Sequence, residues 1–134
     1  MYLLSQLKDN IHSITLERMV CYGSYPVYRV TFNRNGEAVY EGKDHVDRIG
    51  RYVGEIEKSD FEKIAELLDR LGFGNLSSSY SSEDEDKQSV VTSVSYNDGE
   101  KKVENKGDAG PMELWTVEKV IDGVVQDIYW EEEE

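Results

Sequence analysis

The sequence has few residues of the kinds that usually build reactive or cross-linked sites. Its 134 residues include one cysteine, two histidines and two prolines. A single cysteine excludes an intramolecular disulfide and a zinc site made of several cysteines. No apolar run approaches the roughly 20 residues that a membrane-spanning helix needs. The N-terminus lacks a hydrophobic stretch after a basic start, so we expect no export signal, no membrane association and a cytoplasmic location.

Basic residues are also scarce relative to acidic ones. There are 15 Lys and Arg against 28 Asp and Glu, which gives a net charge of −13. This balance excludes direct nucleic-acid binding through a basic surface. Residues 1–76 hold 12 acidic and 10 basic residues, whereas residues 77–134 hold 16 acidic and 5 basic residues. We therefore expect the second half of the chain to attract a basic protein partner.

The common catalytic and cofactor-binding motifs are missing. The sequence has no Gly-x-Ser-x-Gly elbow, no phosphate-binding glycine loop and no dinucleotide fingerprint. It therefore predicts no cofactor and favours a protein that is not an enzyme. The acidic run Glu83-Asp84-Glu85-Asp86 lacks the alternating acids, central glycine and final glutamate of a calcium loop. We interpret this run as a solvated loop and predict no metal site.

What the sequence does contain is alternation of apolar and polar residues between turn signals. This pattern predicts strands at residues 11–20, 27–32, 37–42, 51–56, 90–96 and 100–105. The Asn-Gly and Asp-Gly pairs at 35–36 and 98–99 are typical of hairpin turns. Residues 77–89 have little apolar content and predict a solvated loop. The expected apolar faces comprise Ile14, Leu16 and Val20; Tyr28, Val30 and Phe32; and Val90, Thr92, Val94 and Tyr96.

Two amphipathic helices are predicted from apolar residues at helical spacing. The first has Ser59 as N-cap, Glu62 completing a capping box and Gly72 after its last turn. Pro111 suits the start of the second helix. We expect residues 131–134 to follow that helix as an acidic tail that frays, because negative charge is unfavourable at a helix C-terminus. The apolar faces comprise Phe61, Ile64, Leu67, Leu68 and Leu71 in the first helix, and Leu114, Val117, Ile121, Val124 and Ile128 in the second.

These elements predict an α+β fold. The order is β-β-β-β-α-β-β-α, and hairpin turns join most of the strands. We therefore expect a mostly antiparallel sheet of about six strands with two helices on one face. Residues 1–130 are expected to form one domain, followed by the acidic tail at residues 131–134.

One stretch resembles a family of bacterial domains. The residues Cys21-Tyr22-Gly23-Ser24-Tyr25-Pro26-Val27-Tyr28 follow a predicted strand. They resemble the Cys-Tyr-Gly-x-Cys-Pro-x-Tyr motif of domain-of-unknown-function family 6438, and the likeness is good over residues 14–71. The resemblance implies the fold but no activity. Tyr25 stands at the position of the motif's second cysteine, so this chain alone cannot perform any chemistry that requires the pair.

The candidate binding residues are aromatic and acidic. Tyrosine gives contact area at low entropic cost, and acidic residues attract basic partners. The leading hypothesis is a small acidic, non-enzymatic protein that binds a basic protein partner. The first alternative is a nucleic-acid-mimicking inhibitor of the phage counter-defence type. The second is a thiol or metal enzyme centred on Cys21 with His12 or His45. The candidate partner-binding residues are Tyr22, Tyr25, Tyr28, Glu83, Asp84, Glu85 and Asp86.

Overall fold

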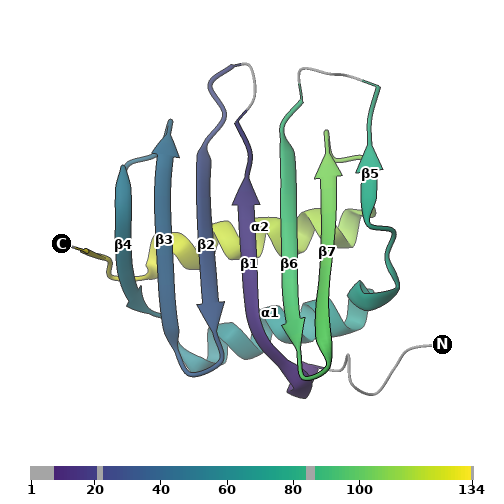
Figure 1. Ribbon diagram of the computed structural model, residues 1–134, viewed down its shortest axis with the longest axis horizontal. Coiled ribbons are helices and arrows are strands. Elements are labelled where there is room, and N and C mark those ends of the chain that lie inside the picture. Colours follow the sequence, from purple (N-terminus) through teal and green to yellow (C-terminus); the bar gives the residue numbers. More distant parts are fainter. Residues whose placement is uncertain (1–7, 21–22, 84–86, 134) are drawn as a thin grey trace.

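The computed structural model describes residues 8–20, 23–83 and 87–133. These residues form an eight-stranded sheet with two α-helices on one of its faces (Figure 1). The strand order is β5-β7-β6-β1-β2-β3-β4-β8. The strands are β1 (Ile11–Arg18), β2 (Val27–Asn33), β3 (Glu37–Asp44), β4 (Gly50–Glu55), β5 (Ser79–Ser81), β6 (Ser89–Tyr96), β7 (Gly99–Lys106) and β8 (Glu131–Glu132). The helices are α1 (Lys58–Leu71) and α2 (Met112–Asp127), with short 3-10 turns at Lys8–Asn10 and Phe73–Asn75.

The predicted α+β class, the antiparallel sheet and the placement of both helices are confirmed. The strand count differs, because β5 and β8 add two short strands to the six expected. Strand β5 pairs in parallel with β7, within the segment predicted to be only a loop. A strand of two or three residues is too short to show a period of two. The pairing of β5 with β7, and of β8 with β4, therefore depends on neighbours that are remote in sequence.

The core lies between the sheet and the two helices. The inward faces predicted for β2 and β6 are buried, as are Ile14 and Leu16 of β1. Val20, in contrast, is 78 % exposed because it follows the end of β1. Both halves of the chain contribute to this core, since β1 pairs with β6. No helix in the described part of the chain is long and apolar enough to cross a membrane.

The first helix begins differently from the prediction. It starts at Lys58 after an extended Glu57, and no side chain caps its N-terminus. The predicted N-cap at Ser59 is therefore wrong. Glu62 does not complete a capping box but accepts a hydrogen bond from Arg34 at 2.7 Å. The predicted end is confirmed, because Gly72 adopts the left-handed conformation (φ 71°).

The chain after α2 returns to the sheet. Glu131 and Glu132 pair with β4, so the prediction that these residues fray is wrong. The indole Nε1–H of buried Trp130 donates a hydrogen bond to the Val125 carbonyl at 2.9 Å, which holds the chain against the end of α2. Gly54 of β4 permits this close packing. A side chain there would meet Ile128 Cγ2 and the Tyr129 carbonyl, each at 2.8 Å.

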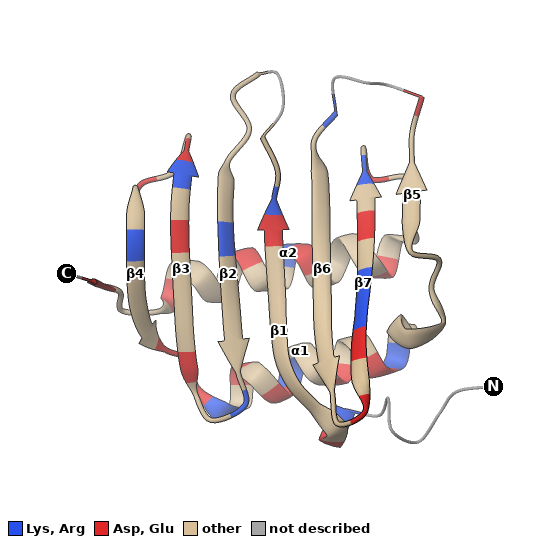
Figure 2. Cartoon of the chain, in the orientation of Figure 1, with Lys and Arg blue, Asp and Glu red and all other residues tan. Residues whose placement is uncertain are grey.

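The uncovered face of the sheet carries a row of alternating charges. Cross-strand register places Glu17, Arg29, Glu41 and Arg51 side by side on β1, β2, β3 and β4. Figure 2 shows the row as alternating red and blue bands at one height. Arg51 bonds both Glu41 and Glu133. This part of the surface is thus electrically mixed rather than uniformly acidic.

Candidate functional site

A pocket of about 450 Å³ opens where helix α2 passes the end of the sheet. Arg18 ends β1, Tyr28 lies at the start of β2 and Gln88 precedes β6, so three strand ends meet there. The connection between β3 and β4 contributes His45 to Arg48, and α2 contributes Glu118 and Asp122. We call this cavity the Glu118 pocket. It gathers residues from all four quarters of the chain.

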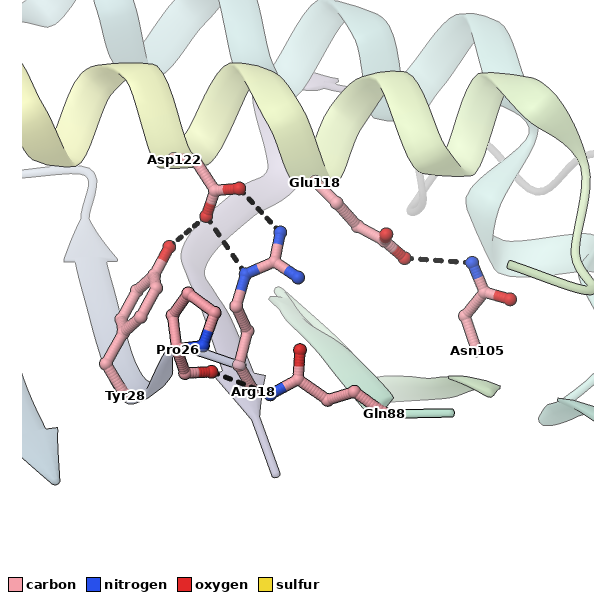
Figure 3. A network of polar contacts seen from close by, with 7 residues as sticks. All are labelled: Arg18, Pro26, Tyr28, Gln88, Asn105, Glu118 and Asp122. Atoms are coloured by element: carbon pink, nitrogen blue, oxygen red, sulfur yellow. Dashed lines mark hydrogen bonds and ion pairs between the residues drawn. The ribbon is translucent and has the colours of Figure 1, made fainter. Parts of the chain in front are cut away.

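An ion pair between the sheet and α2 forms one wall of the pocket. Buried Arg18 donates two hydrogen bonds to the Asp122 carboxylate, from Nε at 3.1 Å and from Nη2 at 2.6 Å. The Tyr28 hydroxyl donates to the same carboxylate (Figure 3). Burial and the Asp122 charge raise the pKa of the Tyr28 hydroxyl, so it remains a donor. The positive charge of Arg18 is thereby balanced by Asp122.

Glu118 is a second carboxylate on the same helix face, one turn before Asp122. Its residue exposure is only 1 %. Its Oε2 accepts a hydrogen bond from Asn105 Nδ2 at 3.0 Å, as Figure 3 shows. The side-chain oxygen of Asn105, Oδ1, in turn accepts a hydrogen bond from the Gly110 backbone N–H at 2.9 Å. Asn105 is neutral, so this bond does not balance the charge of the carboxylate.

Burial raises the pKa of Glu118 to about 7. The hydrogen bond from Asn105 and the charge of Arg18 lower it, whereas the charges of Asp108 and Asp122 raise it further. Glu118 is therefore close to the midpoint of its titration at neutral pH. Carboxyl groups perturbed in this way and facing a cavity are frequent in functional sites.

Gln88 fixes the two ends of the segment between β1 and β2. Its Nε2 donates to the Met19 carbonyl at 3.0 Å and to the Pro26 carbonyl at 2.6 Å. Figure 3 shows the second of these bonds beside Arg18. The pocket wall formed by Tyr25, Pro26 and Tyr28 is thereby attached to the start of β6.

Exposed aromatic and charged residues form the rim. Tyr25 is 38 % exposed and Trp115 is 41 % exposed. The Lys119 Nζ lies 5.6 Å from the centre of the Trp115 ring, in a cation–π contact. The rim carries charges of both signs, from Asp47, Arg48, Lys87, Asp108 and Lys119. The rim thus offers aromatic contact area without a single dominant charge.

Some of the candidate site residues predicted from the sequence line this pocket, and others lie elsewhere. Tyr25 and Tyr28 line the pocket, although the Tyr28 side chain is buried and stacks on Tyr40 at 5.5 Å. Glu83 is exposed and does not line it. His45 lines the pocket and pairs with Asp44 at 3.2 Å, whereas His12 is exposed on β1. The remaining candidates lie outside the described residues: Cys21, Tyr22, Asp84, Glu85 and Asp86.

The two buried charged residues of the described chain, Arg18 and Glu118, were not predicted. Arg18 continues the inward series Ile14, Leu16 at a spacing of two, and Glu118 occupies a core-facing position of α2 between Leu114 and Ile121. A charged residue at an inward position is the signal that could have identified both. No group of three or more His, Cys, Asp or Glu side chains in the described ranges could hold a metal ion.

Comparison with known proteins identifies a family. The family model described as "Domain of unknown function (DUF6438)" matches residues 12–125. The match covers most of the chain, including the pocket residues Arg18, Glu118 and Asp122, so the chain belongs to this family. No curated protein matches the sequence.

Proposed function

We propose that this member of the DUF6438 family is a non-enzymatic binding protein whose Glu118 pocket and rim engage a basic protein partner. The observation that carries the proposal is a pocket with a buried polar wall and exposed aromatic residues at its mouth. Exposed aromatic residues supply contact area for a partner, and buried polar groups fix the position of a bound group. The net charge of −13 favours encounters with positively charged proteins.

The test uses the wild-type chain and its variants, each immobilised, to capture proteins from extracts of the cells that produce this protein. The variant is Tyr25→Ala with Trp115→Ala, which removes both rim aromatics. Tyr129→Ala is the control, because Tyr129 is 80 % exposed and does not line the Glu118 pocket. We expect a basic protein to be retained by the wild type and by the control, but not by the double variant.

The captured protein is then purified and its binding to the chain is measured at low and high salt. We expect the affinity to fall as salt rises, because screening weakens attraction between exposed charges. Equal retention by the double variant, or affinity that is independent of salt, would contradict the proposal.

The nucleic-acid-mimicking alternative has less support. Mimicry of a phosphate backbone needs carboxylates on an ordered surface without interspersed cations. The uncovered sheet face instead alternates Glu17, Arg29, Glu41 and Arg51. An inhibitor of this type would bind the nucleic-acid groove of its target, and competition by DNA for the captured partner would favour it.

The enzyme alternative is supported by one observation, the presence of His45 in the lining of the Glu118 pocket. Thiol chemistry at Cys21 would require a thiolate, which a neighbouring cation or histidine stabilises. Titration of the folded protein with a thiol reagent measures this directly. A thiol pKa of about 8.5 or higher would remove this alternative.

A further inference from the structure

The charges in the deep part of the Glu118 pocket do not balance, because buried Arg18 meets two carboxylates, those of buried Glu118 and partly buried Asp122. Arg18 contributes one positive charge, which Asp122 neutralises through two hydrogen bonds. Tyr28 is neutral. The ionised form of Glu118 therefore leaves one negative charge buried against a neutral amide. A buried charge without a counter-ion is unfavourable, and a cation entering the pocket would remove that cost.

The arrangement favours a cation over an anion. An anion entering the deep part of the pocket would face the carboxylates of Glu118 and Asp122, and the charge of Arg18 is already paired with Asp122 through Nε and Nη2. At the rim, Asp47 and Asp108 offset most of the charge of Arg48, Lys87 and Lys119. The side chains of Tyr25 and Trp115 offer apolar and π surface for an alkyl chain with a cationic end.

We propose that the Glu118 pocket binds the cationic end of a lysine or arginine side chain of the partner, with the Glu118 carboxylate as its counter-ion. This inference rests on the proposed function and specifies what the pocket recognises. The cavity of about 450 Å³ falls within the range of roughly 300–1,000 Å³ of small-molecule sites. It is thus large enough for one extended side chain.

Binding is coupled to the protonation of Glu118. The groups that face this carboxyl are Asn105 of β7, Arg18 of β1, Asp122 of α2 and Asp108 after β7. The lining also includes His45, Lys87 and Lys119. A cation prefers the ionised carboxylate, so it lowers the pKa of Glu118, and acid weakens its binding.

The experiment uses n-butylammonium and n-butylguanidinium as probes, with butyrate and 1-butanol as anionic and neutral controls. Carboxyl carbon NMR of the full chain follows the titration of Glu118 with and without each probe. We expect the cationic probes to lower the Glu118 pKa by about one unit, which corresponds to about tenfold weaker binding to the protonated form. Butyrate and butanol are expected to leave it unchanged.

Two variants distinguish the effect of the Glu118 carboxylate on cation binding from the effect of the protein's net charge. Glu118→Gln is expected to weaken binding of the cationic probes about tenfold at pH 8, whereas Glu113→Gln, an exposed glutamate of the same helix, leaves it unchanged. Equal binding by Glu118→Gln, preferential binding of butyrate, or an unmoved Glu118 titration would overturn the inference. The wild-type titration stands even if a variant fails to fold.

The same variants distinguish this inference from the proposed function. If the purified partner binds Glu118→Gln as tightly as the wild type at pH 8, the cation site is wrong while the binding function holds. If the cationic probes bind as expected but no salt-sensitive basic partner is captured, the cation site stands and the protein-binding function fails.

Discussion

At the residue scale, Thr92 has a buried hydroxyl without a hydrogen-bond partner among the described residues. It lies on β6 between Val90 and Val94, facing the core. A buried polar group without a partner costs free energy, and valine has the same shape without the hydroxyl. We expect Thr92→Val to raise the free energy of unfolding by about 1 kcal/mol.

Urea denaturation measures this change. Thr15→Val serves as the comparison, because the Thr15 hydroxyl is paired with Thr31 at 3.0 Å on the uncovered face. That variant is expected to gain no stability. A loss of stability in Thr92→Val would show that the hydroxyl has a partner, such as a buried water.

Asp122 joins helix α2 to the sheet through Arg18 and Tyr28. Asp122→Asn removes the negative charge that the buried guanidinium of Arg18 bonds directly. We expect the free energy of unfolding to fall by about 2 to 3 kcal/mol. This loss is smaller than the roughly 3 to 5 kcal/mol typical of breaking a fully buried ion pair, because the Asp122 side chain is 29 % exposed.

Chemical denaturation of Asp122→Asn and Asp127→Asn in parallel provides the measurement. Asp127 is an exposed acid of the same helix, and its substitution is expected to change stability by less than about 0.5 kcal/mol. Similar effects at both positions would show that the ion pair contributes no more than a surface charge.

At the element scale, α2 contains a glycine without a structural requirement for it. Gly123 is exposed in the helix interior, and a side chain there would meet nothing within 4 Å. Alanine has the higher helix propensity, so Gly123→Ala is expected to add about 1 kcal/mol to the free energy of unfolding. Thermal and urea denaturation both measure this gain in stability.

Gly72→Ala, in contrast, is expected to lower the free energy of unfolding. Gly72 ends α1 in the left-handed conformation, which alanine adopts only with strain. A stabilising effect at Gly72, or a destabilising one at Gly123, would contradict the assigned positions of these helices.

The connection between β3 and β4 depends on another glycine. A side chain at Gly42 would collide with the Arg48 carbonyl and would lie 2.9 Å from the Tyr40 hydroxyl. Gly42→Ala therefore forces away the loop that brings His45 to Arg48 to the pocket. We expect a loss of about 2 kcal/mol in the free energy of unfolding, as in overpacked cores.

Amide NMR shifts of residues 45–49 would locate the disturbance in Gly42→Ala. The same chemical change at Gly123 is the internal comparison, because only the space around the glycine differs. Unchanged shifts in the loop together with full stability would show that Arg48 does not pack over Gly42.

The longer elements could be predicted from sequence because their periodicity extends over several residues. The inward faces of β2 and β6 and the apolar face of α2 follow this pattern. Strands β5 and β8 could not be predicted, since two or three residues show no period. Arg18 and Glu118 stood at inward positions, but their bonding partners depend on how α2 packs against the sheet. Asp122 is 104 residues from Arg18, and no local pattern connects them.

At the scale of the whole molecule, the two halves of the sequence are interleaved. The elements β5–β7 lie at one end of the sheet, β8 lies at the opposite edge and α2 crosses behind the strands (Figure 1). The acidic second half therefore does not form a separate body. Its residues Glu118 and Asp122 instead enter the cavity shared with Arg18 and Tyr28. The excess of acid in the sequence thus includes two carboxylates that line this cavity.

Glu118 also makes the stability of the whole molecule depend on pH. Its pKa is about 7 in the folded protein, compared with the ordinary 4.5. Between these values the folded state binds more protons than the unfolded state, so stability falls as pH rises. The cost of ionising Glu118 is nearly absent below pH 4.5 and fully present above pH 7.

Glu118→Gln removes this titration while keeping the size of the side chain and an amide that can bond Asn105. We expect the variant to gain about 2 to 3 kcal/mol over the wild type between pH 5 and pH 8. Urea denaturation at several pH values measures the difference, and Glu113→Gln corrects for the loss of one negative charge. A difference that is flat with pH, or that shrinks as pH rises, would show that Glu118 ionises in the folded protein without cost. The pocket would then lack the unbalanced charge that attracts a cation.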